Sequence, residues 1–276
     1  MNPHSAQPTT PIAMLKSFGK NKDLIFQLAS REIKSRYKGS FLGLSWSFIN
    51  PLLMLTIYTF VFTVAFKARW GVETENNKAE FALILFTGLI LHALLAEILT
   101  NAPNLILNNS NYVKKVVFPL EILTVVNLLS ALFHSIVSFF VLLLALIIFS
   151  GFPSFLAILT PIAVFPIIPT ALGLSWTLAS LGVYIRDISQ FIGFLITALI
   201  FISPIFYPVE TLPKKFQILL LFNPLTIPVE QTRSVLLFGK LPSLTTYSIF
   251  LLISMLICCF GFWFFQKTRK GFADVI

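Results

Sequence analysis

Charged residues are scarce in this chain, and their scarcity sets the class of protein. Only 11% of the 276 residues are Asp, Glu, Lys or Arg, whereas 57% are hydrophobic and the mean hydropathy is +0.87. Because a soluble domain carries about a quarter of its residues as charged groups, this composition excludes an ordinary soluble protein. We therefore predict an all-α integral membrane protein, since the helix is the element that satisfies its own backbone in lipid.

Motifs for catalysis and ligand binding are also missing. The two cysteines, Cys258 and Cys259, are adjacent within an apolar run, which excludes a disulfide framework. The three histidines are far apart, and the sequence lacks a glycine-rich loop of the kind that holds a nucleoside triphosphate. The net charge of +9 suggests nucleic acid, but the cations lie at the ends of apolar segments, which membrane orientation explains better. We expect no catalytic group, metal, cofactor or nucleic acid on this chain.

Six apolar segments are long enough to cross a membrane. The predicted spans are Ser45–Phe66, Phe81–Leu99, Glu121–Phe149, Phe155–Tyr184, Ile188–Phe206 and Thr246–Phe265. Pro161, Pro166 and Pro169 should kink the fourth span or split its first half. Six spans put both termini on one side, together with thirteen of the twenty Lys and Arg residues. Because positive charge marks the inner side, both termini are predicted to be cytoplasmic.

Between the fifth and sixth predicted spans lie two apolar runs that are too short to cross. They are Phe216–Phe222 and Leu225–Leu237, separated by Asn223 and Pro224. Runs of this length are re-entrant or interfacial more often than spanning. The alternative, a seventh span, would carry the basic C-terminus to the outer side, against the charge rule. We therefore predict a re-entrant pair that enters from the outer side.

A basic amphipathic helix precedes the first span and ends in a glycine-marked turn, Gly39 to Gly43. Its apolar face is formed at helical spacing by Leu24, Ile25, Leu28, Ala29, Ile33 and Tyr37. Its cationic heads, which can extend to the membrane surface, are Arg31, Lys34, Arg36 and Lys38. They bind a phosphate-bearing lipid or only anchor the helix to anionic lipid, and the sequence leaves both interpretations open.

The loop 101–120, between the second and third predicted spans, is the other polar segment on the inner side. Asn108, Asn109, Ser110 and Asn111 can cap a short helix, which Tyr112, Lys114 and Lys115 follow. A short helix held between two spans can transmit force to both. From the residues alone, a solvated connector with inner-side lysines is the favoured interpretation.

An ordered set of motifs runs from about residue 20 to the C-terminus. Besides the basic helix and the Leu42-Gly43 loop, it comprises WSFINPL at Trp46–Leu52, VKKVVFPLE at Val113–Glu121, PIFYPVETLP and NPLT within Pro204–Thr226, and the final GFADVI. In this order the motifs resemble the type-two ATP-binding-cassette exporters of polysaccharides, which are the permeases for lipopolysaccharide O antigen, teichoic acid and capsule.

The resemblance implies a homodimer of six-span subunits that docks on two cytoplasmic nucleotide-binding ATPase subunits, which bind ATP and Mg²⁺. It implies an interface helix and loop at 22–44, a transmembrane domain at 45–265 and a cytoplasmic tail at 266–276. Residues 1–21 match nothing in this family, and we expect them to form a flexible lead-in. Within the transmembrane domain, 101–120 is the implied coupling loop and 207–238 holds the implied outer gate helices. The resemblance thus overturns the interpretation of 101–120 as a solvated connector. It assigns ATPase coupling to Asn108, Asn109, Tyr112, Lys114 and Lys115.

The implied substrate is a glycan on a polyprenyl diphosphate. Its head needs cations at the inner interface, so the implied lipid-diphosphate entrance comprises Arg31, Lys34, Arg36, Lys38, Gly39 and Gly43. A glycan path suits aromatic rings, and the candidates are Tyr58, Phe62 and Phe66 in the first span with Phe191, Phe194 and Phe201 in the fifth. For any single aromatic stripe, helix packing or lipid contact is the favoured alternative.

Two other classes of function stay open but lack support in the sequence. A membrane enzyme acting on polyprenyl-phosphate lipids needs clustered acidic or histidine residues at one membrane face. An ion-coupled carrier needs charged residues in mid-membrane, where this chain has almost none. We therefore expect a permease subunit rather than an enzyme, placed in the cytoplasmic (inner) membrane among its lipids. O antigen is the first expected cargo, with teichoic acid or capsule as alternatives.

Overall fold

The computed structural model describes residues 8–61, 78–114 and 118–276, and the secondary structure in these ranges is helical. The chain begins with α1 (Pro11–Lys20) and α2 (Lys22–Arg36). Thr10 caps α1, because its side chain accepts a hydrogen bond from the Ala13 N–H at 3.3 Å. The expectation of a flexible lead-in over residues 1–21 is therefore wrong for residues 11–20, which form a capped helix.

Four helices are long and apolar enough to cross a membrane in the described ranges. These candidate spans are Glu80–Asn104, Ile122–Ser150, Phe155–Tyr184 and Leu244–Val275, and they agree with the second, third, fourth and sixth predicted spans. The fifth predicted span forms a shorter apolar helix, α9 (Ile188–Ile202). The first begins as the 3-10 turn η1 (Gly43–Ser45) and α3 (Trp46–Thr59), and residues 62–66 lie outside the described ranges. The chain is thus a multi-pass membrane protein.

The long helices are α4 (Lys78–Asn101), α6 (Ile122–Ser150), α8 (Ile167–Tyr184) and α12 (Leu244–Thr268). The prediction that prolines split the fourth span is confirmed. The segment divides into η5 (Phe155–Leu159), α7 (Thr160–Val164) and α8, with Pro166 at the N-cap of α8. The cause is local, because proline lacks the N–H that would continue the helical hydrogen bonds.

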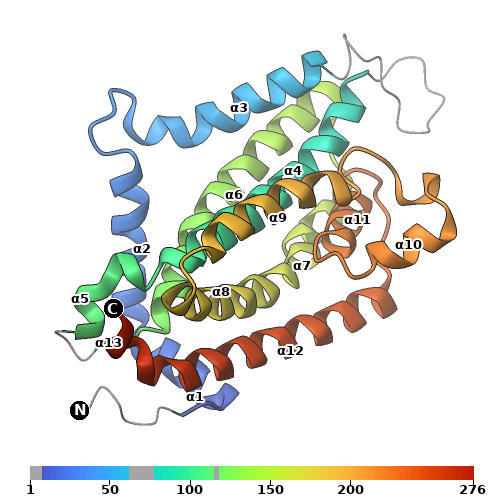
Figure 1. Cartoon of the computed structure of the whole chain (residues 1–276). Helices are drawn as coiled ribbons and strands as arrows, with labels where there is room; N and C mark the ends of the chain where they lie inside the picture. The colour runs from blue at the N-terminus through green and yellow to red at the C-terminus, as the bar shows by residue number, and fades with distance from the viewer. Residues whose placement is uncertain (1–7, 62–77, 115–117) are drawn as a thin grey trace.

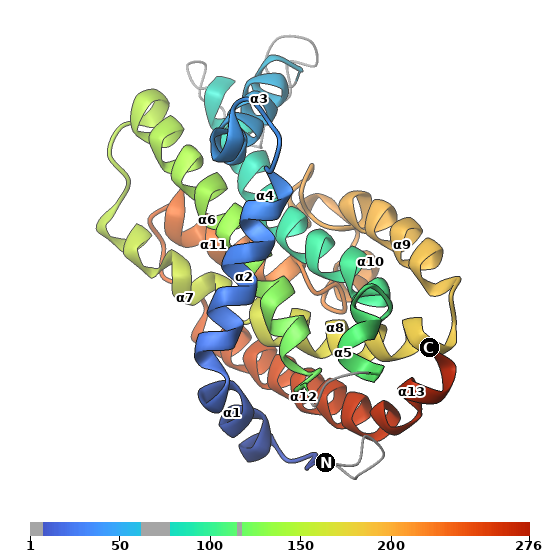
Figure 2. The same ribbon diagram turned by 90° about the vertical axis from the view of Figure 1, so that its left-hand side faces the viewer.

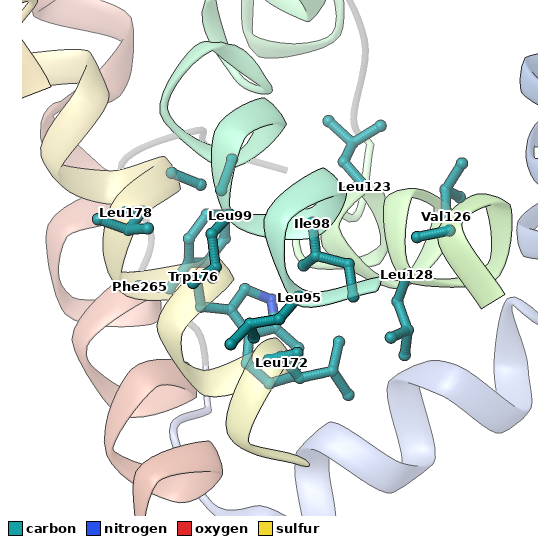
Figure 3. Packing of buried hydrophobic residues seen from close by; sticks show 14 of the residues in the cluster. Leu95, Ile98, Leu99, Leu123, Val126, Leu128, Leu172, Trp176, Leu178 and Phe265 are labelled. Atoms are coloured by element: carbon teal, nitrogen blue, oxygen red, sulfur yellow. The ribbon is translucent and has the colours of Figure 1, made fainter. Parts of the chain in front are cut away.

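The core lies where α4, α6, α8 and α12 meet. Trp176 is fully buried there among leucine and isoleucine side chains, and Figure 3 shows it beside Leu95 and Leu172. Its indole N–H donates to the Glu121 carbonyl oxygen at 3.1 Å. Helices α8 and α12 approach closely because both carry glycine at the contact. A Cβ on Gly261 would overlap the backbone carbonyl of Gly173.

Helices α1 and α13, the first and the last described, lie at one end of the bundle, here called the terminal end (Figure 1). Helix α2 crosses this end instead of running along the bundle, as Figure 2 shows from that side. The connector between α4 and α6 lies there too, as η3 (Ala102–Asn104), η4 (Leu107–Asn109) and α5 (Ser110–Lys114). The chain closes there with η7 (Arg269–Gly271) and α13 (Phe272–Val275), whose Phe272 side chain is fully buried.

The opposite end carries the segment between α9 and α12 (Figure 1). Here η6 (Val209–Thr211) precedes two short helices, α10 (Lys214–Leu220) and α11 (Thr226–Leu236). The two short apolar runs of the sequence therefore form two helices, separated by a turn at Asn223. The Asn223 side chain stabilises this turn, because its oxygen accepts from the Leu225 N–H at 2.9 Å while its amide donates to Ser203.

Candidate functional site

The first part of the site is the basic helix α2 with its turn. Ile25 and Ala29 of the predicted apolar face are buried, and α2 packs on α6 through this face. The cationic residues Arg31, Lys34 and Lys38 are exposed and form no ion pair in the described part of the chain. These three predicted entrance residues therefore present unpaired charge at the terminal end.

The turn after α2 depends on two glycines. Gly39 has φ of 85° and Gly43 has φ of 51°, both in the left-handed region that favours glycine. The chain thereby changes direction sharply between α2 and α3, as the loop in Figure 1 shows. The predicted glycine-marked turn is confirmed, while its binding of a phosphate stays a prediction.

Arg36, the fourth predicted cation, has protein partners. Its Nη1 lies 2.6 Å from Glu97 Oε1 on α4 and 2.9 Å from His134 Nδ1 on α6. His134 Nδ1 also lies 3.0 Å from Glu97 Oε1. The cluster affects Glu32 on α2, because burial raises the pKa of Glu32, Glu97 raises it further, and Arg36 opposes both. Arg36 thus ties the end of α2 to the bundle.

A cavity of about 350 Å³ opens beside this cluster, between α3 and the helices α4, α6 and α9. Its polar lining includes Tyr37, Asn50, Tyr58 and His92, in addition to the Arg36 cluster. The His92 ring nitrogen Nε2 lies 3.1 Å from the Ile196 carbonyl oxygen, which joins α4 to α9. This mixture of hydroxyl, amide and imidazole groups with apolar walls suits a ligand that carries both polar and apolar surface.

The connector lies directly beside α2. Arg31 and Glu32 of α2 line a small cavity of about 140 Å³ together with Asn109 and Tyr112 of the connector. The Tyr112 ring stacks on Phe118 with centroids 4.3 Å apart. Asn109 donates to the Leu105 carbonyl at 2.9 Å, and Asn108 is exposed. Lys114 ends α5, and Lys115 lies outside the described residues.

The connector is anchored to the bundle at its start. Pro103 is buried against α8, and a Cβ on Gly182 would overlap the Pro103 carbonyl. Asn101 and Asn127 are joined by a hydrogen bond of 3.1 Å, which ties the end of α4 to α6. A force applied to the connector would therefore act on α4, α6 and α8 together.

The described members of the two predicted aromatic stripes lie on different surfaces. Phe191, Phe194 and Phe201 are 58%, 69% and 66% exposed on one face of α9. Tyr58 lines the cavity beside α3 instead, so within one subunit it is not part of the exposed α9 face. Phe62 and Phe66 lie outside the described residues. The α9 face is available to lipid, to a second subunit or to a ligand.

Comparison with known proteins identifies the class of this arrangement. The model of the ABC-2 type transporter family matches residues 23–237, which is most of the chain. The chain belongs to the ABC-2 type transporter family. An O-antigen export system permease protein RfbA from Klebsiella pneumoniae is 27% identical over 266 residues, covering 96% of this chain and 99% of the relative. RfbA from Myxococcus xanthus is 24% identical over 267 residues, covering 96% of this chain and all of the relative.

In this ABC-2 transporter, one buried residue at the opposite end of the bundle was not predicted from the sequence. Arg233 of α11 is 1% exposed, although the sequence indicated only an outer-side cation. Its guanidinium donates to the carbonyl oxygens of Pro204 at 2.6 Å, Ile205 at 3.0 Å and Ile84 at 3.1 Å. It thereby holds α11 to α4 and to the chain after α9. An arginine within a short apolar segment was the available signal.

A second group that was not predicted connects the N-terminal and C-terminal segments of this ABC-2 chain. Glu121, 6% exposed, pairs with Arg269 at 2.8 Å and accepts from the Ser17 hydroxyl at 2.7 Å. It thus links α1, the start of α6 and the end of α12. Its partners are 104 and 148 positions away along the chain, so no local pattern predicts them.

Proposed function

We propose that this chain is the membrane subunit of an ATP-driven exporter that moves a polyprenyl-diphosphate-linked polysaccharide across the cytoplasmic membrane. The observation that carries the proposal is the end-to-end similarity to O-antigen export permeases within the ABC-2 family. O antigen is the first candidate cargo, and teichoic acid or capsule are chemically related candidates.

The proposal includes six spans with both termini in the cytoplasm. The four candidate spans support it, together with α9 and the start of the first span in α3. The position of α1 and α13 at one end supports an even number of crossings. Helices α10 and α11 have 7 and 11 residues, which is too short to cross, so we propose that they re-enter from the outer side.

We further propose a homodimer that docks on two ATPase subunits, which bind ATP and Mg²⁺ and hydrolyse the nucleotide. In this arrangement the connector 101–120 is the coupling loop. Its position beside α2 and its anchoring to α8 support this role, because movement of the connector is transmitted to three helices at once.

The proposed lipid-diphosphate entrance lies at α2 and its turn. The exposed Arg31, Lys34 and Lys38 supply charge for the diphosphate, and Arg36 keeps donors available because its side chain is 53% exposed. The cavity beside Arg36 extends from this entrance toward Tyr58. The exposed rings of α9 form the second wall of the glycan path when two subunits face each other.

Deletion of the chain in its own host tests the proposal. The expected result is that the lipid-linked glycan accumulates inside the cell, that surface glycan disappears, and that the intact chain restores export. Deletion of the partner ATPase is the matched control and should give the same accumulation. Unchanged surface glycan in the strain without this chain would contradict the proposal.

A further inference from the structure

A second cavity lies at the terminal end, between α1 and the end of α12. Its volume is about 440 Å³, and Lys16, Lys20 and Asn21 line it on one side. Phe262, Gln266 and Arg269 of the C-terminal segment line the other. Figures 1 and 2 both place α1 beside this end of α12. The entrance residues of α2 take no part in its lining, whereas Phe118 and Pro119, just before α6, also line it.

The charge in this cavity is positive. Lys16 and Lys20 are one helical turn apart on α1, both are exposed, and neither forms an ion pair within the described residues. Arg269 is neutralised by Glu121, which accepts a hydrogen bond from its guanidinium at 2.8 Å. The Phe118 carbonyl oxygen accepts a second hydrogen bond from Arg269 at 2.7 Å. Two lysine charges therefore remain for an anion.

Gln266 provides an independent sign of a ligand. Its side chain is buried, with the residue only 4% exposed, and it lines the cavity. Its carboxamide oxygen has no hydrogen-bond partner in the described part of the chain. Buried polar atoms in folded proteins are paired as a rule, so this oxygen calls for a donor such as a hydroxyl group.

The outer surface of α1 is apolar. Ile12 and Leu15 are 67% and 64% exposed, and their spacing of three residues puts them on one side of the helix. A helix with an exposed apolar side and flanking lysines lies at a bilayer surface, with its apolar side in the acyl chains. The anion that reaches Lys16 and Lys20 is therefore part of a lipid.

We propose that the cavity between α1 and α12 binds the phosphodiester of an anionic phospholipid whose headgroup carries a hydroxyl, as in phosphatidylglycerol. Lys16 and Lys20 bind the phosphate, and the Gln266 carboxamide accepts from the headgroup hydroxyl. The lipid thereby fastens α1 to the end of α12, next to the contact that joins Ser17, Glu121 and Arg269. This site does not depend on which cargo the chain exports.

Lipid binding by the full-length protein in neutral detergent tests the site, with native mass spectrometry as the measurement and phosphatidylglycerol and phosphatidylcholine as probes. We expect selective retention of phosphatidylglycerol, and a loss of roughly tenfold or more in its affinity for Lys16→Gln/Lys20→Gln. The matched control Lys22→Gln/Lys267→Gln removes two exposed charges at the same end but outside the cavity, and should change affinity by less than about twofold. Gln266→Leu should weaken the binding of phosphatidylglycerol and leave that of phosphatidylcholine unchanged.

Three outcomes would overturn the proposal. The first is an equal loss in both double variants, since it would mean diffuse surface attraction. The second is equal retention of phosphatidylcholine, since it would remove the requirement for an anionic lipid. The third is displacement of the lipid by inorganic phosphate at constant ionic strength, since it would make free phosphate the ligand.

Discussion

At the scale of single residues, two arginines hold separate helices against the bundle. Arg36 ends α2 and contacts Glu97 and His134, whereas Arg233 lies inside α11 and binds partners at the opposite end. Arg36 is half exposed, so its ion pair contributes modestly to stability. Arg233 is buried, and its removal leaves carbonyl oxygens without donors, which costs far more.

Arg233→Met should therefore lower the thermal midpoint of the purified protein substantially. Loss of the guanidinium leaves the Pro204 and Ile205 carbonyl groups without these donors, at a cost of about 1–3 kcal/mol each. Lys240→Met is the matched control, because Lys240 is exposed at the same end, and it should leave the midpoint nearly unchanged. Similar midpoints for the two variants would show that Arg233 does not support α11.

At the scale of elements, composition and proline position predicted much of the fold. Four spans, the break before Ile167 and the two short helices after α9 follow from apolar length and from residues that stop helices. Helix α1 was not predictable in this way. Its stability depends on distant partners, since Phe18 stacks on Trp176 at 6.0 Å and Ser17 binds Glu121.

The site shows the same division between local and distant signals. The cations of α2 and the glycine turn follow from spacing along the chain, so they were predictable. The engagement of Arg36 was not, because Glu97 and His134 are 61 and 98 positions away. The aromatic stripes were predicted from spacing alone, and spacing does not determine which surface a helix turns toward the bundle.

The contact between α8 and α12 gives a prediction about packing. Gly261→Ala should destabilise the protein by about 1–3 kcal/mol or more, because the new methyl group overlaps the Gly173 carbonyl. Gly193→Ala is the matched control within α9, where a Cβ meets no atom within 4 Å. It should be neutral or stabilising by up to about 1 kcal/mol. Thermal midpoints in detergent measure both, and equal effects would contradict the close approach.

The connector gives a prediction about coupling. Lys114→Glu/Lys115→Glu should abolish export in a complementation assay while membrane insertion remains normal, because it reverses charge where the ATPase is proposed to dock. Lys22→Glu serves as the control for added negative charge at the terminal end and should retain export. Undiminished export by the connector variant would contradict the proposed coupling role of the connector.

At the scale of the whole molecule, topology follows from the two ends of the bundle. With Cys258 and Cys259 replaced by alanine, single cysteines at positions 22 and 267 should be protected from an impermeant maleimide added to intact cells. Cysteines at positions 215 and 240 should react, because the segment that holds them lies at the opposite end. Labelling of position 267 from outside would mean an odd number of spans.

We propose that ATP hydrolysis by a partner drives a lipid-linked glycan across the membrane through this ABC-2 subunit. Inverted membrane vesicles that contain the chain and its ATPase test it most directly, with protection of the glycan from an added glycosidase as the measurement. Protection should rise with ATP and Mg²⁺ and should stay at background with a non-hydrolysable analogue. Transport that proceeds without ATP and stops when a proton gradient is collapsed would contradict it.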